Sequence, residues 1–399
     1  MNNKPRYTQG TIRSLIVNLL HVTGVITPRC YKLMDNASIA NVVCKMKKEG
    51  VIEKCNNGMV FECFNLANYE SNLDEYFELP YIDYEYFIKF GKHDVKRAKY
   101  AKDEKKGNSI RIIRSAEITV LMYCAGIPTL PSDKESVVQN KVLTSAVYYQ
   151  SREIKHYAGY RDEIQEQVSE NKRMLIASRI NGTLLSAGGN YNVYHIGKDL
   201  QLWNATGEYK IKNQIENLLS GYINQSNCRV QSAILYTYDQ NIFLKLVNPK
   251  TSYGIRFASL ANTYNNIYIL PFDRNGRDMT QIMAYPDWEV LIKELAIEKE
   301  YDMTAAYEYA CDYYEDGKYV YIFCVPNITR YLLFLRKVIY DISAGTKTKD
   351  DFEILCFDFQ QEFVLKSASN YANVLSCEFE EFMNDWNRIE SNKNKGNDA

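Results

Sequence analysis

A repeated helical pattern in the first sixty residues restricts the fold of this chain more than any other segment. Apolar residues recur at helical spacing in three successive stretches, 12–20, 28–34 and 39–46. Glycines follow the first and third stretches, and Thr27-Pro28 is typical of an N-cap followed by the first helical residue. Two short apolar segments then flank Asn56-Asn57-Gly58, a tight-turn signal. The sequence predicts three helices and a β-hairpin within residues 1–64.

The third of these helices, about residues 37–48, has two unlike faces. Its inner face carries Ile39, Val42, Val43 and Met46, and its outer face carries Ser38, Asn41, Lys45 and Lys48. Three helices followed by a hairpin, with a polar and basic third helix, is typical of a winged helix-turn-helix domain that reads the major groove. We therefore predict binding of double-stranded DNA by the outer face, by Arg29, and by Asn56 and Asn57 at the hairpin tip. A small module that binds protein instead is the alternative.

The charge distribution favours nucleic acid as the partner of the N-terminal part. The whole chain carries 48 basic and 49 acidic residues, a net charge of −1. Residues 1–60, however, contain nine bases and three acids, and residues 89–114 contain ten bases and three acids. The intervening residues 61–88 contain seven acids and no base. We expect the two basic segments to face phosphate, or the second to be a solvated helix face or loop.

The remainder of the chain predicts a larger mixed body, so the expected class is α+β. An acidic then basic connector is expected at 65–115, an α/β body with a mixed or antiparallel sheet at 116–390, and a disordered tail at 391–399. Strands are expected at 142–149, 183–185, 191–196, 232–238, 242–247, 267–271, 318–325, 352–359 and 362–366, and helices at 109–125, 152–176, 207–222, 278–298, 326–342 and 377–389.

Cysteine and histidine usage predicts neither a metal site nor a disulfide framework. The ten cysteines include no C-x-x-C pair, and the four histidines are far apart in the sequence. No apolar stretch reaches the length of about 20 residues that spans a bilayer. We expect reduced thiols, no cofactor, no membrane contact and a cytoplasmic location.

One weak catalytic pattern is present. Pro131-Ser132-Asp133, a strand, and Glu153-Ile154-Lys155 resemble the P-D…[DE]-x-K arrangement of restriction-type nucleases, in which two carboxylates hold Mg²⁺ and a lysine orients water. Catalysis would then rest on Asp133, Glu153 and Lys155. The competing interpretation makes Glu153 an ordinary residue of a helix N-terminus, where its charge favours the helix dipole. Phosphate-loop, dinucleotide-binding and metalloprotease motifs are absent from the sequence.

The layout of residues 11–50 with the hairpin, together with the segment 151–155, resembles the replication-relaxation group of proteins from Gram-positive plasmids and conjugative elements. The resemblance implies a winged helix followed by a body of restriction-nuclease-like ancestry, active or degenerate. We therefore expect a DNA-binding accessory protein of plasmid replication or conjugative transfer, without catalysis, whose body forms a homodimer or recruits a replication or transfer protein. A magnesium-dependent nuclease or relaxase-like enzyme, and a ligand-sensing transcriptional regulator, are the alternatives.

Overall fold

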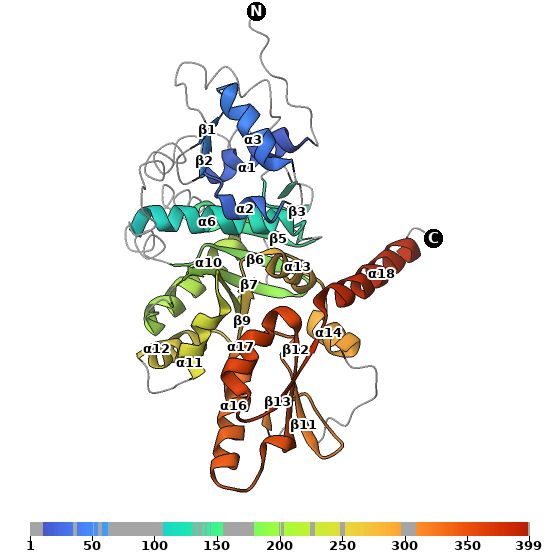
Figure 1. Cartoon of the computed structure of the whole chain (residues 1–399). Coiled ribbons are helices and arrows are strands. Elements are labelled where there is room, and N and C mark those ends of the chain that lie inside the picture. The colour runs from blue at the N-terminus through green and yellow to red at the C-terminus, as the bar shows by residue number, and fades with distance from the viewer. Residues whose placement is uncertain are drawn as a thin grey trace, which may run out of the picture. The chain divides into compact units, whose positions relative to one another are not determined.

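The described part of the chain is a mixture of helices and mixed sheets, which confirms the α+β class (Figure 1). The computed structural model describes residues 11–34, 38–50, 52–54, 58–62, 107–130, 133–134, 138–139, 142–143, 145–154, 179–198, 200, 203–223, 228–247, 252–296 and 309–397. The chain forms two compact units. Unit 1 comprises Met1–His195, Lys210–Arg229 and Gly276–Ala284, and unit 2 comprises Ile196–Tyr209, Val230–Asn275 and Tyr285–Ala399.

Unit 1 begins with the three helices and the hairpin that the sequence predicts (Figure 1, blue). They are α1 (Ile12–Thr23), α2 (Pro28–Tyr31), α3 (Ile39–Lys48), β1 (Ile52–Lys54) and β2 (Val60–Glu62). The Thr11 hydroxyl accepts a hydrogen bond from the Ser14 amide and caps α1, and Gly24 ends that helix in the left-handed conformation. The backbone of Ile26 exchanges two hydrogen bonds with Val60, at 3.0 and 2.9 Å. Ile26 therefore adds a third strand position to the hairpin.

Apolar side chains from all these elements are buried, and Val25 and Met59 cluster with Ile113 and Ala116 of α6 (Gly107–Cys124). The buried residues are Ile16, Leu19, Leu20, Val25, Ile26, Cys30, Leu33, Ile39, Val43, Met46, Ile52, Met59 and Val60. Each helix contributes the face that its sequence periodicity predicts, because only that face is apolar enough to leave water.

The rest of unit 1 is built on one long helix and an antiparallel sheet. The helix is α6 (Gly107–Cys124), and the strands are β5 (Val147–Gln150), β6 (Gly182–Ser186) and β7 (Gly189–Gly197). The predicted turn at 188–190 joins β6 to β7. Gly182 is required where β5 and β6 meet, since a Cβ atom there would lie 2.4 Å from the Tyr149 carbonyl oxygen. The unit also contains β3 (Val138–Gln139), β4 (Val142–Leu143) and most of α10 (Ala205–Ile223) and α13 (Arg274–Met283).

Two predicted segments of this region differ from the structure. The helix predicted at 278–298 is two helices, α13 and α14 (Trp288–Ala296), because Asp287 adopts a positive φ of 54° after Pro286. The helix predicted at 152–176 begins at Ser151, and its residues after 154 lie outside the described residues. Most of the 65–115 connector and the hairpin-tip residues Asn56 and Asn57 also lie outside them.

Unit 2 contains a parallel strand pair, β8 (Ser232–Thr237) and β9 (Asn266–Pro271), with helices between them. The intervening helices are η1 (Gln240–Phe243), α11 (Leu244–Val247) and α12 (Ser252–Ala261). The strand predicted at 242–247 is therefore wrong. The Asp239 carboxylate accepts a hydrogen bond from the Asn241 amide at 2.9 Å and starts a helical turn there. The largely apolar run of residues 242–247 is too short for its sequence pattern to distinguish a strand from a buried helix.

A four-stranded sheet completes unit 2 (Figure 1, orange to red). Its order is β10 (Tyr313–Glu315), β11 (Lys318–Ile322), β12 (Phe352–Phe357) and β13 (Asn373–Cys377). β10 and β11 are antiparallel, whereas β11, β12 and β13 are parallel. The mixed pairing confirms that the body is not a simple doubly wound sheet.

Helices connect and follow the parallel strands of that sheet. They are α16 (Ile328–Ser343), the short η2 (Lys349–Asp351), α17 (Asp358–Ala368) and α18 (Phe379–Asn397). The strand predicted at 362–366 is wrong, because those residues form the middle of α17, where the return between parallel strands requires a crossover. α18 continues through residues 391–397, which the sequence assigned to a disordered tail.

Candidate nucleic-acid interface

The outer face of α3 is open to solvent at the positions that its periodicity predicts. Ser38, Asn41, Lys45 and Lys48 are exposed. Ile39, Val43 and Met46 on the opposite side are at most 2% exposed, while Val42 lies at the margin. Lys47, which the sequence analysis left out, is also exposed, and its position in the last turn could have identified it. The exposed side of α3 is thus mainly polar and basic, with Ala40 and Cys44 exposed beside these residues.

Three lysines in the last turn of α3 give that surface a positive charge. None of Lys45, Lys47 and Lys48 forms an ion pair with another residue in the described ranges. The nearest acid in the sequence, Glu49, is engaged by the Arg13 guanidinium of α1. Bases at a helix C-terminus are also favoured by the helix dipole, so their clustering costs little stability.

The hairpin packs closely against the start of α2. Gly58 has a φ of +81°, and a Cβ atom there would lie 2.8 Å from the Pro28 Cγ atom. The glycine of the predicted turn is thus required both by its backbone conformation and by this close approach. The neighbouring Asn56 and Asn57 lie outside the described residues.

Arg29 has a charged partner within unit 1. Its guanidinium nitrogen lies 3.7 Å from a carboxylate oxygen of Glu117, and its side chain is 35% exposed. Glu117 belongs to α6 and is fully buried. Part of the Arg29 charge therefore compensates a buried acid, and a contact of Arg29 with DNA stays a prediction. Glu117 lies 88 residues away in the sequence and leaves no local signal.

Glu117 is the centre of a buried polar network. The Thr27 hydroxyl donates to one carboxylate oxygen at 2.7 Å, and His195 Nε2 lies 2.9 Å from the other. Thr27 occupies the predicted N-cap position of α2, but its hydroxyl contacts Glu117 and makes no capping hydrogen bond. Burial lowers the pKa of His195, against the opposing influence of Glu117. The Glu117 carboxylate and the His195 imidazole are both fully buried. Their contacts connect α6 with β7 and, through Thr27, with the start of α2.

Further polar side chains of unit 1 satisfy the carbonyl groups at the ends of the first two helices. The Arg152 guanidinium donates to the Val22 carbonyl oxygen at 2.5 Å, and the Arg277 guanidinium donates to the Leu33 carbonyl oxygen at 2.9 Å. Positive donors at helix C-termini pair with carbonyls that lack an intrahelical partner. Residues of the three-helix segment are therefore bonded to the sheet-containing part of the same unit.

Of the three residues in the nuclease pattern, Glu153 has partners that the structure describes. Glu153 is buried, and its carboxylate accepts hydrogen bonds from the Gln150 amide at 2.6 Å and from the Lys134 ammonium. Glu153 thus reaches back to the N-terminus of the helical turn that starts at Ser151. Asp133 lies beside Lys134 in the chain, and Lys155 lies outside the described residues. Within the described ranges, no three histidine, cysteine, aspartate or glutamate side chains are grouped to hold a metal ion.

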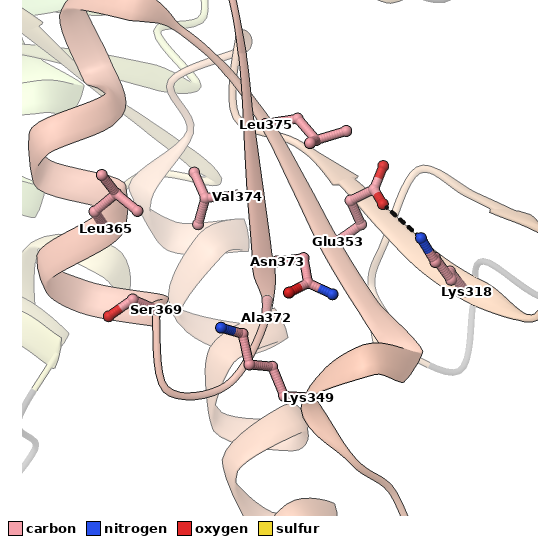
Figure 2. A pocket seen from close by; sticks show the side chains of 9 residues that line it. All are labelled: Lys318, Lys349, Glu353, Leu365, Ser369, Ala372, Asn373, Val374 and Leu375. Atoms are coloured by element: carbon pink, nitrogen blue, oxygen red, sulfur yellow. Dashed lines mark hydrogen bonds and ion pairs between the residues drawn. The ribbon is translucent and has the colours of Figure 1, made fainter.

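A groove of about 530 Å³ lies along β13 in unit 2 (Figure 2). Lys318 and Glu353 form an ion pair of 3.1 Å on one side of it. The remaining walls are Lys349, Leu365, Ser369, Ala372, Asn373, Val374 and Leu375. The only carboxylate among these lining residues, Glu353, is thus paired with Lys318, and Lys349 is the other charged lining residue.

Comparison of the chain with family models, curated proteins and solved structures found no match. In the described part of the chain, none of the helices combines the length and the apolar character needed to span a bilayer.

Proposed function

We propose that the chain binds double-stranded DNA and that residues 11–62 act as a winged helix with α3 as the recognition helix. The observation that carries the proposal is the outer face of α3, where Ser38 and Asn41 are exposed beside three lysines without ion-pair partners in the described ranges. The strand position at Ile26, between α1 and α2 and paired with the hairpin, is an arrangement typical of winged helices.

The residue types suit a DNA groove. An asparagine amide can donate to and accept from the edge of an adenine, and a serine hydroxyl can contact any base or a phosphate. Lysines at one end of the helix would contact phosphates, which orient the protein and supply most of the affinity. In the proposal Asn41 and Ser38 therefore read bases, and Lys45, Lys47 and Lys48 fix the position of the helix.

The remaining part of the chain, in this proposal, binds a second copy or a replication or transfer protein of a mobile element. The mobile-element setting rests on the sequence resemblance. Support for a protein-binding role comes from α16, where Leu333 is 54% exposed and Tyr340 is 69% exposed. These two residues are seven positions apart, and they therefore lie on the same side of the helix.

Fluorescence anisotropy with a mixed-sequence duplex across a salt series tests the DNA-binding proposal. The double variant Lys45→Ala/Lys48→Ala is expected to bind about tenfold more weakly than wild type, with a salt slope reduced by about one unit per lost phosphate contact. The matched control is Lys210→Ala/Lys349→Ala, which removes the same charge from two exposed lysines outside residues 11–62.

The control variant is expected to bind like wild type. Circular dichroism should show that both double variants unfold at the wild-type temperature, because all four lysines are exposed. Equal affinity and equal salt slope in wild type and Lys45→Ala/Lys48→Ala would mean that α3 is not the DNA-binding element. An equal loss in both double variants would mean that only the net charge of the chain matters.

A further inference from the structure

Two cysteines far apart in the sequence meet at the carboxyl end of the parallel strands in unit 2. Cys324 lies two residues after β11, and Cys377 is the last residue of β13. β12 lies between these strands and runs parallel to both, so the carboxyl ends of all three strands lie at one edge of the sheet. The Sγ atoms of Cys324 and Cys377 are 3.8 Å apart. This spacing brings two thiols within contact distance without a bond between them.

The two thiols differ in environment. Cys324 is fully buried, and burial raises its pKa well above the ordinary value. Cys377 is partly exposed, and the hydrogen bond with Cys324 lowers its pKa, against the opposing effects of its burial and of Asp358 and Glu378. Cys377 therefore loses its proton more readily than Cys324 and is the more nucleophilic sulfur of the pair.

We propose that Cys377 and Cys324 form a peroxide-sensitive thiol pair, with Cys377 as the reacting residue and Cys324 as the resolving residue that closes a disulfide. The combination of a partly exposed thiol and a buried neighbour within contact distance is the arrangement found at redox-sensing cysteines. The inference is independent of the DNA-binding proposal, because it concerns residues of unit 2 alone.

The oxidant is a hydroperoxide, and the two steps balance. The Cys377 thiolate attacks one peroxide oxygen, an S–O bond forms, the O–O bond breaks, and the leaving oxygen takes up a proton to become water or an alcohol. The Cys324 sulfur then loses its proton and attacks the sulfenic sulfur of Cys377, and hydroxide leaves and is protonated to water. Two thiols are oxidised by two electrons in total, and one peroxide is reduced.

Disulfide closure requires a small local movement. The Sγ atoms must approach from 3.8 Å to about 2.05 Å. Cys324 lies in the turn between β11 and α16, and Cys377 lies at the junction of β13 and α18. Neither residue is in the middle of a helix or strand, so a side-chain rotation with a small shift of the turn suffices.

A third cysteine of the same sheet serves as an internal control. Cys356 lies in β12, is fully buried, and donates from its thiol to the Leu375 carbonyl oxygen at 3.5 Å. Burial raises the pKa of Cys356 to about 12. Cys356 should therefore stay reduced under conditions that oxidise its two neighbours.

Peptide mapping of the full chain tests the proposal. The purified, reduced protein is treated under native conditions with hydrogen peroxide, the peroxide is removed with catalase, and the protein is denatured in the presence of N-ethylmaleimide and digested with trypsin without reductant. Each of the three cysteines falls in a separate tryptic peptide, 319–330, 350–366 and 367–388. The expected product is 319–330 joined to 367–388, two hydrogens lighter than the separate peptides and released by dithiothreitol, with 350–366 recovered as the maleimide adduct.

Two variants separate the roles of the cysteines. In Cys324→Ser the joined peptide is expected to disappear and Cys377 to be trapped by dimedone as a sulfenic acid. In Cys356→Ser the joined peptide should form as in wild type. Wild-type protein in which peroxide leaves peptides 319–330 and 367–388 unjoined, or in which Cys356 is joined as readily as Cys324, would overturn the proposal. The peptide map of the wild-type protein tests the proposal by itself, so its result stands even where a variant fails to fold.

Discussion

The two units bury their charged groups in different ways. In unit 1 a buried acid has a buried partner: Glu117 is hydrogen-bonded to His195, whose lowered pKa favours the neutral imidazole, and Glu153 is paired with Lys134. In unit 2 the buried Asp312 is 3% exposed, but its partners Arg330 and Lys293 are 29% and 21% exposed and reach solvent. The interior of unit 2 contains many aromatic rings, among them Tyr321 and Phe334, which stack at a centroid distance of 5.0 Å.

This difference indicates what holds each unit together. A fully buried ion pair gains little net energy over an apolar pair, but the loss of one partner leaves an uncompensated charge in a dry interior. In unit 1 the buried Glu117 carboxylate links segments that are far apart in the sequence, because it contacts both Thr27 and His195. We infer that unit 1 is sensitive to single charge deletions and to pH, whereas unit 2 is sensitive to the loss of apolar volume.

The largest effect is expected when Glu117 is removed. Glu117→Ala leaves His195 and the Thr27 hydroxyl without their acceptor and is expected to lower the free energy of unfolding by about 3–5 kcal/mol. The matched control is Glu380→Ala, whose exposed side chain in the first turn of α18 should contribute about 0.5 kcal/mol or less. Urea unfolding followed by circular dichroism measures both. Similar small losses in the two variants would show that the buried network does not hold unit 1 together.

A smaller effect is expected from a conservative change in the aromatic interior of unit 2. Phe334 is fully buried, and Phe334→Leu removes ring area while keeping an apolar side chain, so a loss of about 1–1.5 kcal/mol is expected. Arg336→Ala, at an exposed position of the same helix, is the control and should change stability by about 0.5 kcal/mol or less. Thermal unfolding of the two variants compares them. An equal or larger loss for Arg336→Ala would show that the aromatic interior is not what stabilises unit 2.

The smallest effect concerns the pH dependence of unit 1. Burial lowers the pKa of His195 in the folded state below its ordinary value of 6.5, so the unfolded chain binds the proton more tightly. The contribution of His195 to the free energy of unfolding is therefore fully present above about pH 6.5. It is lost as the pH falls below that value, by at most about 1.4 kcal/mol per pH unit.

The measurement compares urea midpoints of wild type and His195→Asn at pH 7.5 and 5.5. The wild type is expected to lose about 1 kcal/mol more than the variant over this interval, since the asparagine does not titrate. All other titrating groups are common to both proteins and cancel in the difference. An equal loss in the two proteins would mean that His195 is protonated inside the folded unit, as a partner of ionised Glu117.

Local pattern accounts for the elements that were predicted well. The caps and helical periodicity of α1 and α3 and the turn at 188–190 depend on residues within a few positions of each other, so the chain carries their signal in one short window. The same periodicity predicted the exposed face of α3. It could not distinguish strand from helix at 242–247 and 362–366, because short apolar runs fit both and only the neighbouring elements select one.

Contacts between distant segments account for what the sequence could not show. Nothing near Arg29 in the chain indicates that Glu117 lies beside it, and nothing near Cys324 indicates that Cys377 does. The pattern around Glu153 suited a nuclease, yet the partner of Glu153 is Lys134, which folding brings to it. Local propensity is encoded within a few residues, whereas the pairing of buried charges and thiols depends on strand order and on which helix faces meet. Those arrangements exist only after the chain has packed.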